Sequence, residues 1–249
     1  MMENLLNSEN KDRLKFLLTY PSFDQNTYDK RIQELLSLDI SSVYSSGKVQ
    51  LHKISILGKG SVGIVTLVRC RNRYFVLKIR RTDANRANMY DEVLYQSLAN
   101  SIGIGPFLLN FSENFILMEY IKGSNILDWY NSKNSTCEKI LKCTCSILQQ
   151  CFHLDRIKLD HGQLNRLDKH IIISNDGTPT ILDFETSSTK RRTGNVTNVS
   201  QSFFLNGPIY DRLKDSLDND NKQVIKIIKD YKKNLSPENF KKILNFLKF

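Results

Sequence analysis

The stretch ILGKGSVGIVTLV, residues 56–68, carries three glycines in the pattern G-x-G-x-x-G, and FVLKI follows at residues 75–79. Apolar β-forming residues lie on both sides of Gly58, Gly60 and Gly63, so the pattern predicts that the glycines lie in the turn of a β-hairpin. A dinucleotide-binding fingerprint needs a helix directly after its glycines. The strand predicted in place of that helix excludes this class of site.

Glycines without a Cβ allow backbone N–H groups to approach nucleotide phosphates closely. Lys59, between the first two glycines, and Val65, two residues after Gly63, are further candidate nucleotide-binding residues. Lys78 ends a predicted third strand, from which its ammonium can reach the α- and β-phosphate oxygens. An ordinary glycine-rich turn and an exposed strand lysine are the alternative interpretations of these residues. The decision between them depends on partners elsewhere in the chain.

A helix capped by Thr82-Asp83 and ending near Asn100 is predicted after these strands. Helical spacing places four of its residues on one face: Met89, Glu92, Val93 and Gln96. A carboxylate among apolar neighbours requires a cation, and Lys78 is the candidate partner of Glu92. Asp91 is the rival partner, and a surface glutamate is the plain alternative.

The segment LDHGQLNRLDKHIIISNDGTPTILDFETSS occupies residues 159–188. Residues 171–173, a turn at residues 175–177 and residues 180–182 predict a hairpin that leads into Asp183. Asp183 therefore directly follows an apolar strand and precedes Phe184, a context that argues against an ordinary turn residue.

The glycine turn, Lys78, Glu92, the HGQL sequence and the DFE sequence, in this order, resemble the eukaryotic-like protein kinase superfamily. The resemblance covers about residues 50–205 and is to its small atypical members, the RIO kinases and the small kinase of the KEOPS complex. It is closest to the predicted archaeal serine/threonine kinases that carry KIRRTD and HG[QE]L. The resemblance implies an α+β bilobal fold with a β-rich N-lobe and a trimmed helical C-lobe, binding ATP with Mg²⁺ or Mn²⁺.

The resemblance also assigns roles within the segment that carries HGQL. Gln163 stands where the family has its catalytic Asp, and Asp168 stands where it has a metal-binding Asn. Gln163 cannot accept a proton, but its amide oxygen can orient a hydroxyl group. Asp168 is a Mg²⁺ ligand together with Asp183, or a displaced base, and Lys169 and His170 are candidates to reach the γ-phosphate or the acceptor.

Four further residues are interpreted next to the resemblance. The sequence Met118–Gly123 resembles a kinase hinge, which makes the carbonyl of Glu119 and the N–H of Ile121 the expected partners of adenine. His161 is more simply a structural histidine than a catalytic one. Glu185 replaces the usual Gly of the family and also occurs in small-molecule kinases, so a small-molecule acceptor stays open.

The expected organisation is a helical N-terminal extension at residues 1–50, an N-lobe at residues 51–121 and a C-lobe at residues 122–249. The C-lobe helices are predicted at about residues 135–154, from residue 195, at residues 222–233 and from Pro237, with Ser236 as an N-cap. Four of the five cysteines fall within the first of these helices. Reduced cysteines packed as small apolar residues are expected rather than disulfides or a metal site.

The formal net charge is +10, from 36 basic and 26 acidic residues, which suits an anionic partner such as a nucleotide, RNA or an acidic protein. No apolar run reaches spanning length and the N-terminus lacks the order of a signal peptide, so a cytoplasmic protein without a membrane partner is expected. We therefore expect a serine/threonine protein kinase that uses ATP, acts on a protein acceptor or on itself, and is slowed by Gln163. The alternatives are a pseudokinase or ATPase switch on an RNA, ribosomal or protein complex, and a small-molecule kinase.

Overall fold

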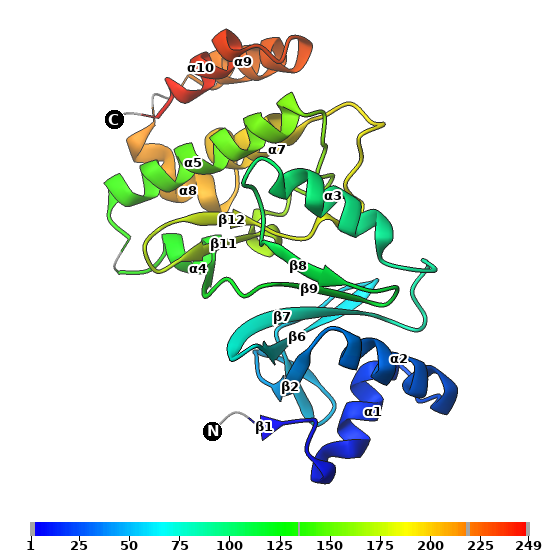
Figure 1. Cartoon of the computed structure of the whole chain (residues 1–249). Helices are drawn as coiled ribbons and strands as arrows, with labels where there is room; N and C mark the ends of the chain where they lie inside the picture. Colours follow the sequence, from blue (N-terminus) through cyan, green and yellow to red (C-terminus); the bar gives the residue numbers. More distant parts are fainter. Residues whose placement is uncertain (1–2, 134, 218–219, 248–249) are drawn as a thin grey trace. The chain divides into compact units, whose positions relative to one another are not determined.

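The computed structural model describes residues 3–133, 135–217 and 220–247, and the chain divides into two compact units. The first unit runs to Leu94 and includes Pro106–Tyr120; the second comprises Tyr95–Gly105 and the chain from Ile121 onward. Both helices and antiparallel strands are present, which confirms the predicted α+β class (Figure 1). Within the described residues, no helix combines the length and the apolar character needed to cross a membrane.

The first unit is built on an antiparallel sheet in the order β1-β2-β6-β7-β9-β8, with β5 added to β6. Its strands are β1 (Glu3–Asn4), β2 (Ile40–Ser45), β5 (Gly58–Lys59), β6 (Gly63–Cys70), β7 (Arg73–Arg80), β8 (Leu108–Phe111) and β9 (Phe115–Glu119). Strands β3 (Val49–Leu51) and β4 (Ile54–Ile56) form a separate hairpin. The predicted glycine hairpin is therefore β5–β6.

Residues 1–50 are helical only in part. A short 3₁₀ helix (Ser8–Asn10), α1 (Lys11–Thr19) and α2 (Gln25–Ser37) confirm helical structure for much of this segment. The expectation that the whole segment is helical is wrong from Ile40 onward, because β2 pairs with β6 of the sheet. Val43 of β2 is fully buried together with leucines of α1 and α2 in the core of this unit. Ile40, Val43 and Tyr44 are residue types that are common in strands, and pairing with β6 fixes the strand at this position.

Helix α3 (Tyr90–Asn100) begins later than predicted. Thr82 does not cap it, because its hydroxyl group donates to the carbonyls of Thr19 and Tyr20. Asp83 is also engaged elsewhere, by the Arg81 guanidinium at 2.7 Å. The predicted buried face is confirmed by Met89, Glu92, Val93 and Gln96.

The second unit packs helices around α5 (Cys137–Arg156) and a three-stranded antiparallel sheet in the order β10-β11-β12. The strands are β10 (Gly123–Asn125), β11 (Ile171–Ser174) and β12 (Pro179–Ile181). The other helices are α4 (Ile126–Tyr130), α6 (Leu167–His170), α7 (Asn195–Phe204), α8 (Pro208–Leu213), α9 (Asn221–Lys233) and α10 (Pro237–Leu244), with 3₁₀ turns at Phe184–Thr186 and Lys214–Ser216.

Several local predictions for this unit are confirmed. The β11–β12 hairpin and helices α7 and α9 lie where the sequence patterns place them. Ser236 caps α10 by accepting a hydrogen bond from Asn239 N at 3.2 Å, with Pro237 in the first turn, and α9 and α10 pack side by side (Figure 1). All five cysteines are free thiols, but Cys137 is exposed rather than buried.

Candidate functional site

The glycine hairpin of the first unit has one glycine that its own packing requires. A Cβ on Gly63 would lie 3.1 Å from Lys78 Cε and 3.2 Å from Ile79 O, so a side chain there would crowd β7 and the Lys78 side chain. A Cβ on Gly58 or Gly60 would meet no atom closer than 3.5 Å, and neither has a positive φ. The unliganded chain tolerates a side chain at both positions, which leaves the close approach of a ligand as a physical reason for glycine there.

Lys78 and Glu92 form the buried ion pair that the sequence predicts. Lys78 Nζ lies 2.7 Å from Glu92 Oε1, and the two side chains are 7% and 1% exposed. Lys78 comes from β7, opposite Val65 of β6, and Glu92 comes from the first turn of α3. Asp91, the rival partner, is exposed. Removing two charges from water is costly, so a buried pair next to a glycine hairpin is a stronger signal of function than of stability.

The predicted adenine contacts lie where the chain passes from one unit to the next. Glu119 ends β9, and its backbone N–H donates to Phe107 O at 2.9 Å while its carboxylate accepts from Phe107 N at 3.2 Å. Ile121 is the first residue of the second unit after this strand. The role of both residues in adenine binding stays a prediction.

His161 of the second unit has the surroundings of a histidine with a structural role. Its ring is fully buried, its Nε2 lies 2.8 Å from Leu182 O, and its edge contacts the Phe184 ring. Nδ1 has no hydrogen-bond partner among the described residues, so the neutral ring carries its proton on Nε2 and donates it to the carbonyl. Burial lowers the pKa of His161 from 6.5 to about 4, which keeps the ring neutral near pH 7.

The buried His161 predicts a stability that falls in mild acid. The unfolded chain binds a proton on this ring near pH 6.5, whereas the folded chain binds it only near pH 4. Between these values the unfolded state holds more protons, so we expect the free energy of unfolding to drop by about 3 kcal/mol on acidification. Urea unfolding curves recorded at several pH values between 7 and 4 measure this drop in the free energy of unfolding.

The control for this experiment is the variant His161→Gln, which keeps an N–H donor but does not titrate in this range. Burial raises the pKa of Asp155, which works in the opposite direction in acid and is common to both proteins. The contribution of His161 is therefore the difference between the two pH profiles. Parallel profiles would contradict the assignment of a buried neutral histidine.

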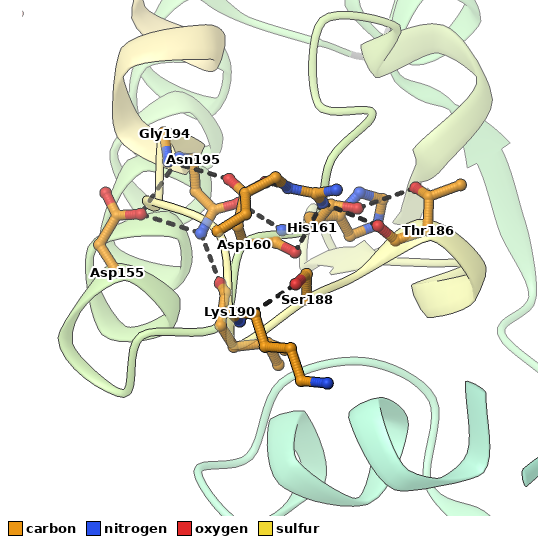
Figure 2. A network of polar contacts seen from close by, with 10 residues as sticks. Asp155, Asp160, His161, Thr186, Ser188, Lys190, Gly194 and Asn195 are labelled. Carbon is orange, nitrogen blue, oxygen red and sulfur yellow. Dashed lines mark hydrogen bonds and ion pairs between the residues drawn. The ribbon is translucent and has the colours of Figure 1, made fainter. Parts of the chain in front are cut away.

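A network of polar contacts holds the backbone around His161 in place (Figure 2). Asn195, at the start of α7, accepts from His161 N at 2.9 Å and donates its side-chain N–H to Asp155 Oδ1 at 2.9 Å and to Leu159 O at 2.7 Å. Asp155 also accepts from the backbone N–H groups of Asn195 and Val196 and from the Tyr231 hydroxyl. Two helices, α5 and α7, thus position the loop that carries Gln163.

A second part of this network ties the segment after β12 to the same loop. Arg191 forms an ion pair with Asp160 and donates from Nη2 to Thr186 O at 2.7 Å, and Asp160 also accepts from Gly194 N at 2.9 Å. Gly162 has φ +87°, and a Cβ there would lie 2.9 Å from Thr186 O and overlap the Arg191 guanidinium. Glycine at this position is therefore required both by conformation and by space.

The four residues predicted to act on the phosphate or the acceptor lie in different surroundings. Gln163 is half-buried, and its carbonyl accepts from Arg166 N at 3.0 Å in a turn. Asp168 and Lys169 are exposed on α6, and Asp168 lines a small cavity with Asn165 and residues of α7 and α8. His170 is buried, with Nδ1 3.7 Å from Asp183 Oδ2. Of these four residues, His170 is the one that this contact places next to Asp183.

Asp183 has an unusual backbone conformation. It follows β12 with φ 67° and ψ 77°, a left-handed conformation that is strained for a residue other than glycine. Phe184 beside it is fully buried against Gly105, where a Cβ would lie 2.8 Å from the Phe184 ring. Such strain persists only where surrounding packing imposes it, and it is common at functional sites.

Glu185 adds a second carboxylate that the sequence did not assign to a metal. Its carboxylate and that of Asp183 have oxygen atoms within 4.8 Å of each other. Two oxygen donors at this spacing can hold a hard cation such as Mg²⁺. The signal was present in the spacing D-x-E, but only the 3₁₀ turn at Phe184–Thr186 places both side chains together.

A scan against protein-family models finds no match for the sequence, and a search of curated proteins finds none.

Proposed function

We propose that the chain is an ATP-dependent serine/threonine protein kinase of an atypical, RIO-like type, with the two units as the lobes of a kinase-like fold. The observation that carries the proposal is the buried ion pair between Lys78 and Glu92 next to the β5–β6 glycine hairpin. A strand lysine held by a helix glutamate is the arrangement that positions nucleotide phosphates in kinases.

In this proposal each unit supplies a defined part of the chemistry. Backbone N–H groups of the glycine hairpin and the Lys78 ammonium bind the phosphates of ATP, and Glu92 fixes the position of that ammonium. Asp183 and Glu185 hold the divalent cation, with Asp168 as a further candidate ligand. When bound, Mg²⁺ or Mn²⁺ neutralises charge on the transferred phosphoryl group.

Gln163 sets the expected rate. Its amide oxygen can accept a hydrogen bond from the acceptor hydroxyl and orient it, but it cannot remove the proton. The loss of a general base lowers rates by roughly 10²–10⁴-fold, so the proposed enzyme is slow. His170, whose Nδ1 lies 3.7 Å from Asp183 Oδ2, is the imidazole that we propose takes up the proton in place of a carboxylate.

A nucleotide-binding switch without phosphoryl transfer is the second candidate, and Gln163 is the observation that favours it. Such a protein would keep Lys78, Glu92 and Asp183 for binding and would need no base. An RNA, ribosomal or protein complex would then be its partner. Binding of ATP without labelling of any protein distinguishes this candidate from the kinase.

The experiment is incubation with γ-labelled ATP and Mg²⁺ or Mn²⁺, with and without a generic basic protein acceptor. We expect label on protein, reduced about 10²-fold or more in Lys78→Met because phosphate positioning is lost. Lys53→Met is the matched control, since Lys53 is an exposed residue of the β3–β4 turn, and it should label like the wild type. Circular dichroism of each variant checks that the fold is intact. Equal labelling by Lys78→Met and the wild type would overturn the proposed kinase function.

A further inference from the structure

The first unit contains a polar cavity of about 270 Å³ that the proposed kinase function does not use. Its walls come from α2, the end of β7 and the turn between β8 and β9 (Figure 1). A single water needs only about 10–15 Å³ of such space, so the cavity has room for a polyatomic ligand. The groups that the argument uses are Thr27, Lys30, Arg31, Arg80 and Asn114.

Two guanidinium groups converge on one neutral acceptor in this cavity. Arg31 is 2% exposed and donates from Nη1 to Leu18 O and from Nη2 to Asn114 Oδ1 at 3.1 Å. Arg80 donates from Nε to the same Asn114 Oδ1 at 2.9 Å and from Nη1 to Arg86 O at 2.9 Å. In the described part of the chain, neither guanidinium forms an ion pair with a carboxylate. A buried cation without an opposite charge is costly, and this cost favours binding of an anion.

The two carboxylates that line the cavity do not supply that charge directly. Glu34 accepts from Ser112 Oγ at 2.6 Å, from Asn114 N at 3.0 Å and from Asn114 Nδ2 at 2.6 Å, so both of its oxygens are occupied. Glu113 is exposed, and water screens its charge. Burial and the neighbouring charge of Arg80 lower the pKa of Arg31 to about 10, although Glu34 and Glu113 act in the opposite direction. The lining of the cavity carries three cationic side chains and two carboxylates, so positive charge is in excess there.

We propose that this cavity binds a phosphate dianion, either inorganic phosphate or the phosphate of a small monoester. Guanidinium groups present paired N–H donors that match the oxygens of phosphate, and two of them line this site. Lys30 at the exposed side adds a third positive charge, and Thr27 adds a hydroxyl group. Asn114 holds the two guanidinium groups in position with its amide oxygen, so little rearrangement is needed on binding.

The test is isothermal titration calorimetry of the full chain with inorganic phosphate and with O-phosphoserine, at constant ionic strength set with chloride. We expect binding to the wild type and a dissociation constant about tenfold higher in Lys30→Glu, where one attractive charge becomes repulsive. Lys30 is exposed, so this variant should fold even if variants of the buried Arg31 do not. Lys11→Glu, at the exposed start of α1, is the matched control and should bind like the wild type.

A second variant separates this site from the proposed nucleotide site. Lys78→Met should retain phosphate binding, because Lys78 does not line the cavity. Loss of binding in Lys78→Met, an equal effect of Lys30→Glu and Lys11→Glu, or no heat with either phosphate compound would each overturn the proposal. Tighter binding of O-phosphoserine than of inorganic phosphate would identify a monoester as the ligand, and the reverse order would identify free phosphate.

Discussion

Replacing Asp183 by asparagine is expected to lower phosphoryl transfer by about 10³-fold while leaving the protein folded. The side chain of Asp183 is 36% exposed, so replacing its carboxylate by an amide of the same size does not disturb the buried core. An amide at this position is a much weaker ligand for a hard divalent cation than a carboxylate. Electrostatic stabilisation by such a cation contributes several kcal/mol to the transition state, which corresponds to this loss of rate.

The measurement is the initial rate of label transfer from γ-labelled ATP as a function of Mg²⁺ concentration. Asp176→Asn is the matched control, because Asp176 is exposed in the turn between β11 and β12, where its carboxylate accepts from Ser174 Oγ and Thr178 N. We expect that control to keep the wild-type rate. A rate in Asp183→Asn within a few fold of the control would exclude Asp183 as the metal ligand of the proposed reaction.

Glu185 allows a finer test of the same cation site. If Asp183 and Glu185 hold the cation together, Glu185→Gln should raise the Mg²⁺ concentration needed for half-maximal rate more than it lowers the maximal rate. A carboxylate that only shaped the backbone would lower the maximal rate without changing the Mg²⁺ dependence. The two quantities come from the same titration.

Replacing Asp155 by alanine is expected to destabilise the chain by about 4 kcal/mol. Asp155 is 2% exposed and accepts hydrogen bonds from Asn195 N, Asn195 Nδ2, Val196 N and the Tyr231 hydroxyl. Alanine would leave these buried donors without their acceptor, and each unsatisfied donor costs about 1–3 kcal/mol, reduced where water can enter. Figure 2 shows how Asp155 and Asn195 point toward each other.

Urea unfolding at pH 7 measures this cost, and Tyr231→Phe provides the internal comparison. That variant removes one donor and leaves three hydrogen bonds to the carboxylate, so about 1 kcal/mol is expected. The order of destabilisation should be Asp155→Ala, then Asp155→Asn, then Tyr231→Phe. A smaller loss for Asp155→Ala than for Tyr231→Phe would show that the network contributes little to the fold.

Short-range sequence signals determined many local features of this protein. The β5–β6 hairpin, the β11–β12 hairpin and the Ser236 cap of α10 each depend on residues within a few positions of one another. The inward direction of Glu92 followed from helical spacing, because residues three and four apart share a face wherever the helix begins. These features were predictable because the interactions that create them are local.

Other features needed the tertiary structure because distant segments supply the energy. Strand β2 exists because β6 offers its hydrogen bonds, and Thr82 fails to cap α3 because the carbonyls of Thr19 and Tyr20 take its hydroxyl group. The convergence of Arg31 and Arg80 on Asn114 joins residues up to 83 positions apart, and no spacing in the sequence indicates it.

The candidate site divides along the same line. The sequence alone singled out Lys78, Glu92 and Asp183 through residue type, order and spacing. The tertiary structure decided that the backbone of Asp183 is left-handed and that Glu185 and His170 lie close to its carboxylate. It also decided that Asp155 and Asn195 hold the loop of Gln163. Residue type determines which chemistry a side chain can perform, whereas only the packing of remote segments determines which side chains meet.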